Sequence, residues 1–315
     1  TMPFSLLKLR STYKNINRVR QIINVFLKYE FGHIIDQLRL HRYVSLRKRL
    51  KTFGQWPAIK GHTVPERLRM AFSELGPSFI KLAQLLSSRP DLITAPFADE
   101  FKKLQDNVPP FPSDDAKKII EEETHLPIDK IFAKFHDKPT AAASIAQVHQ
   151  GTLLDGSDVI IKVQRPDIRE QIETDINILT TIAQLMDKHI PESRFFNPTG
   201  IVDEFSRTVR KELDFSEEAK NCLRFRKNFE NNPHIYIPRI HSSFSTEKIL
   251  TMERIEGVRI DDISGIEGMG IDRKELAKNG VDAYFKMVLE DGFFHADPHP
   301  GNIFAMSEGQ IGFMD

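Results

Sequence analysis

The chain has 315 residues, of which 40% are hydrophobic and 28% charged, as is ordinary for a globular protein of one or two domains. Its single cysteine, Cys222, excludes an intrachain disulfide and a cysteine-based zinc site. No run of about 18 apolar residues occurs, so we expect no transmembrane helix within this sequence, and the first residues lack the apolar core of a secretory signal.

The net charge of zero is unevenly distributed along the chain. Residues 1–51 carry 12 Lys and Arg but only Glu30 and Asp36 as acids, a balance of +10 that leaves −10 on the remainder. A basic leader on an acidic body argues against a general nucleic-acid binder. It favours contact of the leader with an anionic surface or with the body itself.

A basic amphipathic helix is predicted over residues 14–31, within a basic N-terminal helical region that we assign to residues 1–62. Its apolar stripe consists of Val19, Ile22, Ile23, Phe26 and Leu27. Such a helix can lie on an anionic membrane or pack on the folded domain, and the sequence leaves both alternatives open.

Residues 63–135 are predicted to form a helical extension that is interrupted sharply at Gly76-Pro77. The helix after this break carries Lys81 and Gln84, which stand three residues apart and therefore share a face. Two such polar residues on an apolar helix are usually its solvated side, so a functional role for them needs support from elsewhere in the chain.

A small-residue loop, a hairpin and a strand that contains Lys162 come next. The turn is signalled by Asp155-Gly156, and Lys162 lies in the returning strand. Protein kinases place a glycine-rich loop over the ATP phosphates and a strand lysine against them in this order. Here small side chains replace the glycines, and they still admit the close approach of a phosphate, although the loop is stiffer. The loop residues are Ala141, Ala142, Ala143, Ser144, Ile145, Ala146 and Gln147.

An acidic cluster lies in a long helix predicted from about residue 198 to 230. It consists of Glu212, Asp214 and Glu218. Only Asp214 and Glu218 have the i, i+4 spacing of a shared face, so all three can face one cleft only if the helix is locally irregular. Acidic clusters on helices are mostly solvated, so a role for this one depends on Lys162 being near.

A second chemical cluster lies between His295 and Asn302, in a loop that prolines and a glycine keep from being helix or strand. Asn302 follows Asp297 by five positions, the H-x-D-x-x-x-x-N spacing of the protein-kinase catalytic loop. In that loop the acid accepts or orients the proton of the phosphoryl acceptor, and the amide helps to hold the metal. A short apolar hairpin then leads to Asp315, a second candidate metal ligand.

The same loop supports a different interpretation as a metal site. His295, Asp297 and His299 alternate, so an extended segment would point all three to one side. Zinc and iron accept such ligands, as in metal-dependent hydrolases and oxygenases.

Together these segments resemble the UbiB family of atypical protein-kinase-like proteins. Four motifs carry the resemblance in chain order: Lys81-Leu82-Ala83-Gln84, similar to the family's K-x-G-Q signature; the alanine-rich loop from Ala141 to Gln147; the E-x-D element Glu212-Leu213-Asp214; and the catalytic loop from His295 to Asn302. One departure is Ala83, which stands where the family signature has glycine and puts tight helix contacts there in doubt.

The resemblance implies an α+β, protein-kinase-like fold with an N-terminal helical extension. Residues 136–257 would form the N-lobe with a mostly antiparallel sheet, and residues 258–315 the start of a helical C-lobe. The chain is expected to be truncated relative to complete family members.

The resemblance also implies that the site binds ATP or ADP with Mg²⁺. Lys162 would hold the phosphates and pair with Glu218, Asp297 would be the catalytic acid/base, and Asn302 and Asp315 would bind the metal. Other expected contacts and regulators are Ala141 to Gln147, Met252 and Glu253 around the nucleotide, and Lys81, Gln84, Glu212 and Asp214 as residues that close the cleft to bulky substrates.

The implied activity is that of a kinase-like phosphotransferase or ATPase in ubiquinone (isoprenoid quinone) biosynthesis. The expected location is cytoplasmic and peripheral to the inner membrane, with any membrane helices beyond residue 315. Expected partners are an anionic membrane surface, quinone-biosynthesis proteins or a lipid, with a homodimer as one candidate assembly. Two alternatives stay open: the metal-dependent hydrolase or oxygenase, which leaves Lys162 and Glu218 without a role, and a non-catalytic nucleotide-binding pseudokinase.

Overall fold

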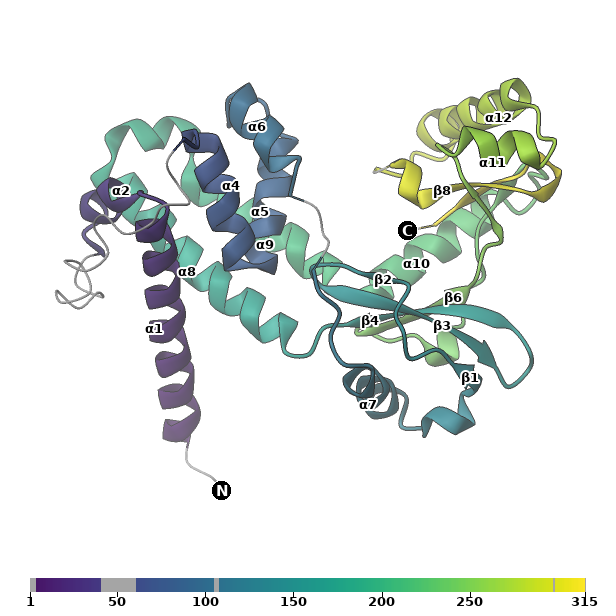
Figure 1. Cartoon of the computed structure of the whole chain (residues 1–315), viewed down its shortest axis with the longest axis horizontal. Helices are drawn as coiled ribbons and strands as arrows, with labels where there is room; N and C mark the ends of the chain where they lie inside the picture. Colours follow the sequence, from purple (N-terminus) through teal and green to yellow (C-terminus); the bar gives the residue numbers. More distant parts are fainter. Residues whose placement is uncertain (1–3, 41–60, 105–107, 297, 315) are drawn as a thin grey trace. The chain divides into compact units, whose positions relative to one another are not determined.

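The computed structural model describes residues 4–40, 61–104, 108–296 and 298–314, with side chains from Ile16 onward. The chain folds into two compact units (Figure 1). Each unit is assembled from three segments: unit 1 from Thr1–Pro109, Ala142–Ile145 and Asp167–Arg210, and unit 2 from Pro110–Ala141, Ala146–Pro166 and Lys211–Asp315. The four regions predicted from the sequence follow a different division and stay a prediction.

Unit 1 is built from helices. They are α1 (Phe4–Lys28), α2 (Gly32–Gln37), α4 (Val64–Leu75), α5 (Pro77–Ser87), α6 (Ala95–Phe101), α8 (Ile168–His189), the 3-10 helix η4 (Pro191–Phe196) and most of α9 (Pro198–Glu212). The predicted break between α4 and α5 is confirmed, since Gly76 adopts a φ of 91°, a conformation that favours glycine. The first helix starts earlier than the predicted residue 14, because neither proline nor glycine interrupts the chain between Phe4 and Lys28.

The apolar stripe of α1 packs inside unit 1. Ile23 clusters with Ile35, Leu38 and Leu40 of the α2 region, and the facing side of α8 completes the cluster. Arg18 extends from the same helix to the buried Asp175 of α8. The stripe therefore has the contacts that the packed-helix alternative predicts, while binding of the basic leader to a membrane stays a prediction.

Unit 2 contains a five-stranded sheet in the order β1-β3-β4-β6, with β2 paired to β3. The strands are β1 (Phe132–Phe135), β2 (Ala141–Ala142), β3 (Ala146–Leu153), β4 (Asp158–Gln164) and β6 (Ile249–Glu253). The pairs β1/β3, β3/β4 and β4/β6 are all antiparallel. The predicted hairpin at Asp155-Gly156 is confirmed as the turn between β3 and β4.

Two helices cover opposite faces of this sheet (Figure 1). Helix α7 (Ser113–Thr124) buries Ala116 and Ile120 against Val159, Ile161 and Val163 of β4. Helix α10 (Phe215–Asn228) lies on the other face, where Lys162 of β4 contacts it. Successive side chains of a strand point to opposite faces of the sheet. Val159, Ile161 and Val163 therefore pack in the core under α7, and Lys162 points toward α10.

The expectation of one helix from 198 to 230 is wrong. The chain breaks after Glu212, and Asp214 becomes the N-cap of α10, where its Oδ1 accepts a hydrogen bond from the Ser216 backbone N–H at 3.0 Å. Aspartate is a preferred N-cap because its side chain satisfies a free helix N–H. The chain is thus irregular between Glu212 and Asp214, which is the condition for Glu212, Asp214 and Glu218 to face one cleft. That they face one cleft stays a prediction.

A second sheet of unit 2 has the order β5-β9-β8-β7. Its strands are β5 (Ile235–Tyr236), β7 (Gly257–Arg259), β8 (Ile303–Met306) and β9 (Ile311–Phe313), with short 3-10 turns η3 (Ile128–Lys130), η5 (Ser242–Phe244), η7 (Pro300–Asn302) and η8 (Ser307–Gly309) elsewhere in the unit. The antiparallel β8/β9 pair confirms the predicted apolar hairpin.

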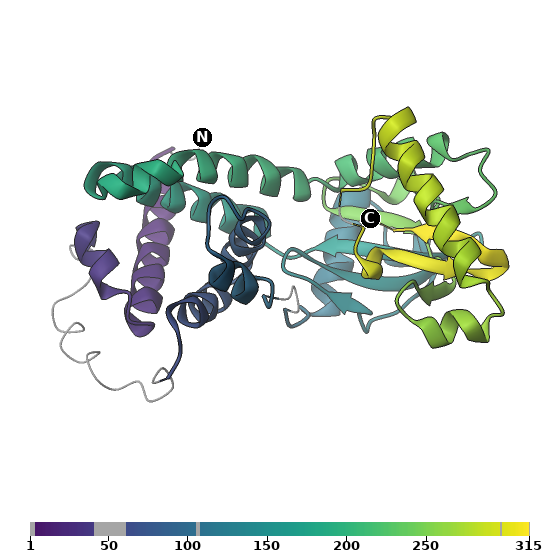
Figure 2. The same cartoon turned by 90° about the horizontal axis from the view of Figure 1, so that it is seen from above.

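Two helices accompany the second sheet, α11 (Ile263–Gly268) and α12 (Arg273–Phe285), and α12 continues into the π-helical turn η6 (Lys286–Glu290). Ala283 and Met287 pack with Ala305 and Ile311 of the hairpin, and Figure 2 shows α12 beside these yellow strands. The other face of this helical run is exposed. None of the described helices is long and apolar enough to cross a membrane.

Candidate active site

Lys162 and Glu218 form a hydrogen-bonded ion pair. The Lys162 Nζ lies 2.8 Å from Oε2 and 3.0 Å from Oε1 of Glu218, and the side chains are 23% and 19% exposed. The same Nζ lies 5.0 Å from the centroid of the buried Phe215 ring, a cation–π distance. The structure thus brings together two residues that the sequence analysis paired across a long interval.

Gln164 holds the start of α10 in place, a role that the sequence analysis missed. Its Nε2 donates to the backbone carbonyls of Leu213 at 2.6 Å and Glu247 at 2.9 Å, and the side chain is buried. Because Gln164 lies two residues beyond Lys162, both side chains leave the same face of β4. Gln164 therefore fixes the chain break before α10, and Glu218, near the start of that helix, reaches Lys162. The alternation along β4 was the signal that could have found it.

The alanine-rich segment runs from β2 into β3. Ala141 is exposed, whereas Ser144, Ile145 and Ala146 are buried. The Ser144 Oγ is inaccessible to solvent and has no hydrogen-bond partner among the described residues. A buried hydroxyl without a partner costs about 1–3 kcal/mol, so a hydrogen bond from a ligand would offset that cost.

The side chain of Gln147, the last residue of this segment, makes hydrogen-bonding contacts within the protein. Its Oε1 accepts from the Phe111 backbone N–H at 3.0 Å, and its Nε2 lies 2.8 Å from the His149 Nε2. Burial lowers the pKa of His149, whose Nδ1 lies 2.9 Å from the His136 carbonyl. These contacts tie the segment before α7 to β3, and a direct contact of Gln147 with a nucleotide stays a prediction.

The remaining predicted nucleotide contacts lie at the end of β6. Met252 is buried and stands opposite Ile160 of β4. Glu253 accepts hydrogen bonds from the Tyr236 hydroxyl at 2.6 Å and the Arg239 backbone N–H at 3.1 Å. Burial, followed by the bond to Glu253, raises the pKa of Tyr236 to about 12. Glu253 thus joins β6 to the chain that leads to the second sheet.

The four predicted regulatory residues divide between the two units. Lys81 and Gln84 are half-buried on α5 of unit 1, where the neighbouring Phe79, Ile80, Leu82 and Ala83 are buried. Ala83 is fully buried, so a methyl group is accommodated where the family signature has glycine. Glu212 and Asp214 belong to unit 2, so joint closure of the cleft by these carboxylates with Lys81 and Gln84 stays a prediction.

The predicted catalytic loop ends in a hydrogen-bonded turn. The Asn302 N–H donates to the His299 carbonyl at 2.8 Å, and the Met314 N–H donates to the Asn302 carbonyl at 2.8 Å. The second bond joins the residue that follows β9 to the turn that contains Asn302. Asp297 and Asp315 themselves lie outside the described residues.

The two histidines of the alternative metal site have different surroundings. His295 is 8% exposed and lies beside Cys222, Met287 and Phe313 in the core. His299 is exposed, and its Nδ1 accepts from the Gly301 N–H at 3.1 Å. Among the described residues, which do not include Asp297, no group of three His, Cys, Asp or Glu side chains could hold a metal.

These features define a kinase-like protein. They are an antiparallel sheet whose strand lysine pairs with a helix glutamate, a following loop with the Asp-x-x-x-x-Asn spacing, and a hairpin after that loop. The chain belongs to the ABC1 atypical kinase-like family, whose domain profile matches residues 103–315. The expected resemblance and the α+β kinase-like fold class are thereby confirmed.

Relatives and one solved structure agree with this membership. The chain is 44% identical to the probable protein kinase UbiB of Marinobacter nauticus and 41% identical to that of Vibrio cholerae serotype O1, over 92% of its length in each case. It spans about half the length of these curated relatives, 53% of each. The Mycobacterium tuberculosis protein Rv3197, solved in complex with erythromycin, superposes with a TM-score of 0.57 at 26% identity, over 79% of this chain and 62% of that one.

Proposed function

We propose that the chain is the nucleotide-binding part of an atypical kinase or ATPase that uses ATP with Mg²⁺. The observation that carries the proposal is the Lys162–Glu218 pair, with its two short N–O distances of 2.8 and 3.0 Å. In kinases the same kind of pair holds a lysine against the nucleotide phosphates, and it must be formed for phosphoryl transfer.

The predicted metal ligands and the segment before β3 also support a magnesium nucleotide. Amide and carboxylate oxygens, as in Asn302 and Asp315, are ligands that Mg²⁺ accepts. The buried Ser144 hydroxyl lies in the segment predicted to cover the phosphates. It could donate a hydrogen bond to a phosphate oxygen. When bound, the metal would neutralise charge on the phosphates.

Each residue of the site would then have a separate role in phosphoryl transfer. Lys162 orients a phosphate through its ammonium group, and Glu218 and Phe215 keep that group in place. Asp297 accepts or orients the proton of the phosphoryl acceptor. That acceptor is water in an ATPase, and a lipid or a protein hydroxyl in a kinase.

We also propose that this activity supports isoprenoid quinone biosynthesis at a membrane surface. The support is the family: the curated relatives carry the name UbiB, and the UbiB resemblance implies that pathway. The basic leader, with its balance of +10, supports peripheral contact with an anionic inner membrane from the cytoplasmic side.

Thermal melting of the full-length protein with nucleotide and metal tests the proposal. ATP with Mg²⁺ should raise the melting temperature, ATP with a chelator should not, and Asp315→Asn should reduce the rise because it removes a predicted metal ligand. No shift at millimolar ATP with Mg²⁺, together with stoichiometric binding of zinc or iron that His299→Ala abolishes, would replace the proposal with the metal-dependent hydrolase or oxygenase. A shift without any ATP turnover would favour the pseudokinase.

A further inference from the structure

Helix α10 of unit 2 reaches from β4 to the second sheet. Glu218, near its start, pairs with Lys162 of β4, and Phe229, at its end, packs in the core of the second sheet. Figure 1 shows α10 extending from the first sheet toward α11 and α12. Phe225 follows Glu218 by seven residues, about two helical turns, so both side chains leave the same side of the helix.

Two consecutive side chains of α10 contact Phe293, which lies two residues before the predicted catalytic loop. The Phe225 and Phe293 rings have their centroids 4.7 Å apart and their planes inclined by 39°. The guanidinium carbon of Arg224 lies over the same Phe293 ring, 4.0 Å from its centroid. A guanidinium is attracted by the negative face of an aromatic ring, and a pair of rings adds its own attraction. Both contacts hold Phe293 against α10.

The backbone at Phe293 is fixed as well. Its N–H donates to the Met287 carbonyl at 3.0 Å, and Gly292 just before it has a φ of 56°, a conformation that favours glycine. The chain therefore turns back at the end of η6 and enters the loop from a fixed point. Asp297 follows four residues later, and four residues extend over at most about 14 Å. The position of Phe293 thus limits the position of the predicted catalytic acid.

Arg224 directs its charge at this ring. The side chain is exposed, and within the described ranges no acid pairs with its guanidinium and no carbonyl accepts from it. Arg226, two residues further on, instead donates to the Ile237 carbonyl at 2.8 Å. An effect of Arg224 on the loop must therefore pass through Phe293, as far as the described residues are concerned.

We propose that Arg224 is a positioning residue for phosphoryl transfer, which holds Phe293 against Phe225 and thereby sets the entry of the catalytic loop. The inference rests on the proposed function, since it assumes that Asp297 acts on the phosphoryl acceptor. Because α10 also carries Glu218, one helix holds both the lysine that orients a phosphate and the loop that contains Asp297. Loss of the Arg224 contact should therefore slow turnover and leave nucleotide affinity unchanged.

Steady-state hydrolysis of ATP with Mg²⁺ by the full-length protein, together with its calorimetric Kd for the same nucleotide, tests this role. We expect kcat to fall at least tenfold in Arg224→Gln and in Phe293→Leu, with Kd within twofold of the wild type. Phe293→Tyr keeps the ring and should recover kcat to within threefold. The matched control is Lys227→Gln, which removes a positive charge from an exposed position of the same helix and should leave kcat within twofold.

A double variant tests whether Arg224 acts through the ring. Arg224→Gln combined with Phe293→Leu should be no slower than Phe293→Leu alone, because the arginine has then already lost its partner. Multiplied losses in the double variant would overturn the inference. So would unchanged kcat in both single variants, an equal loss in Lys227→Gln, no recovery in Phe293→Tyr, or a Kd that rises as much as kcat falls.

Hydrogen exchange of backbone amides gives a readout that needs no turnover. Residues 293–302 should exchange faster in Arg224→Gln than in the wild type, with β4 and α8 unchanged, because the entry of the loop is held less firmly. Wild-type exchange over these residues would overturn the inference. Wild-type protein that binds ATP without hydrolysing it would also overturn the inference but leave nucleotide binding intact, whereas absence of binding would contradict the proposed function itself.

Discussion

His149 is held as a neutral ring by two directional partners. Its Nδ1 lies 2.9 Å from the His136 carbonyl, which can only accept, so Nδ1 carries the hydrogen. The Nε2 therefore accepts from the Gln147 amide at 2.8 Å. A second proton on the ring would point at this amide, whose oxygen is already used by the Phe111 N–H.

We expect the ring to make stability depend on pH. Burial lowers the pKa of His149 in the folded state below its ordinary value, while the unfolded chain titrates near 6.5. The unfolded state thus binds more protons in this window, so the contribution is complete above about pH 6.5 and is lost as the pH falls below it. Urea unfolding at pH 8 and pH 5.5 should show a smaller pH dependence in His149→Gln than in wild type. The same change at the exposed His33 is the control, and an unaltered dependence in His149→Gln would exclude this ring as the source.

Short-range patterns predicted several elements well. The turn residues between β3 and β4, the Gly76-Pro77 break and the apolar strands β8 and β9 all depend on local backbone preferences. The chain break at Leu213 depends on a partner far away in sequence, since the Leu213 carbonyl is bound by Gln164. A helical pattern cannot reveal such a contact, which explains why one long helix was predicted there.

Strand β4 positions helix α10 through Gln164, and loss of that side chain should displace Glu218. Gln164→Leu leaves the buried Leu213 carbonyl without this donor, a cost of about 1–3 kcal/mol, whereas the Glu247 carbonyl keeps the hydrogen bond from the Phe215 N–H at 3.0 Å. We expect a lower free energy of unfolding and a weaker affinity for nucleotide. Gln171→Leu, at an exposed position of α8, is the control for the substitution itself. Equal affinity in Gln164→Leu and wild type would show that Gln164 serves the fold alone.

Helices α1, α5 and α8 are joined by a buried polar network. Asp175 is fully buried and accepts from Arg18 at 2.7 and 2.8 Å and from the Ser78 hydroxyl at 2.6 Å. Arg18 also donates to the Leu75 carbonyl at 2.7 Å. The sequence pattern of α1 does not reveal this contact, because periodicity cannot show a buried acid more than 150 residues away.

Breaking this network should destabilise unit 1 strongly. Asp175→Leu leaves the Arg18 charge without its buried partner, and such a loss costs roughly 3–5 kcal/mol. Glu74→Gln, which alters the more exposed Lys28–Glu74 pair, should cost at most about 1 kcal/mol. Denaturant midpoints of the two variants give the comparison, and similar midpoints would mean that the buried network contributes no more than a surface pair.

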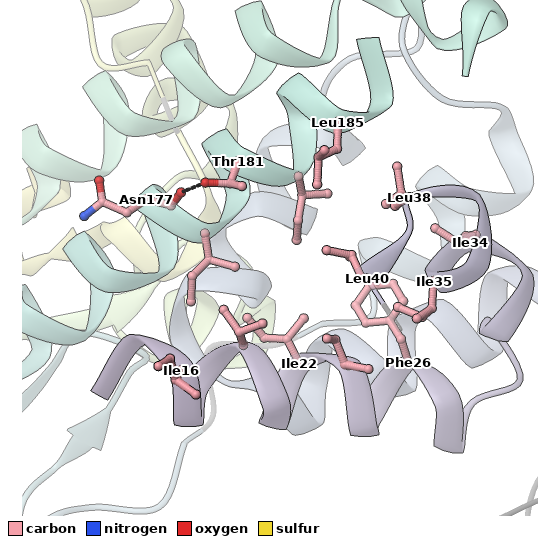
Figure 3. A pocket seen from close by; sticks show the side chains of 14 residues that line it. Ile16, Ile22, Phe26, Ile34, Ile35, Leu38, Leu40, Asn177, Thr181 and Leu185 are labelled. Carbon is pink, nitrogen blue, oxygen red and sulfur yellow. Dashed lines mark hydrogen bonds between the residues drawn. The ribbon is translucent and has the colours of Figure 1, made fainter. Parts of the chain in front are cut away.

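At the scale of the whole molecule, the chain consists of a helical unit and a unit that carries the kinase-like elements. The sequence identified the kinase-like elements of unit 2 because kinase motifs are short and ordered, and it paired Lys162 with Glu218 by analogy. It could not reveal the packing of α1 and the α2 region against α8 (Figure 3), because these segments are far apart in the chain. Ala142–Ile145 belong to unit 1, although the residues on either side belong to unit 2. This assignment depends on tertiary contacts that a local sequence pattern does not contain.

The most direct test of the central claim is the affinity of the full-length protein for ATP with Mg²⁺, measured by isothermal titration calorimetry. Lys162→Ala should lower it at least tenfold, about 1.4 kcal/mol, and Glu218→Gln should lower it less because the lysine remains. Two matched controls carry the same kinds of substitution, Lys134→Ala at an exposed lysine of the same sheet and Glu217→Gln next to Glu218. Both controls should bind within twofold of the wild type. Wild-type affinity in Lys162→Ala, or equal losses in Lys134→Ala, would contradict the assignment of this pair to a nucleotide site.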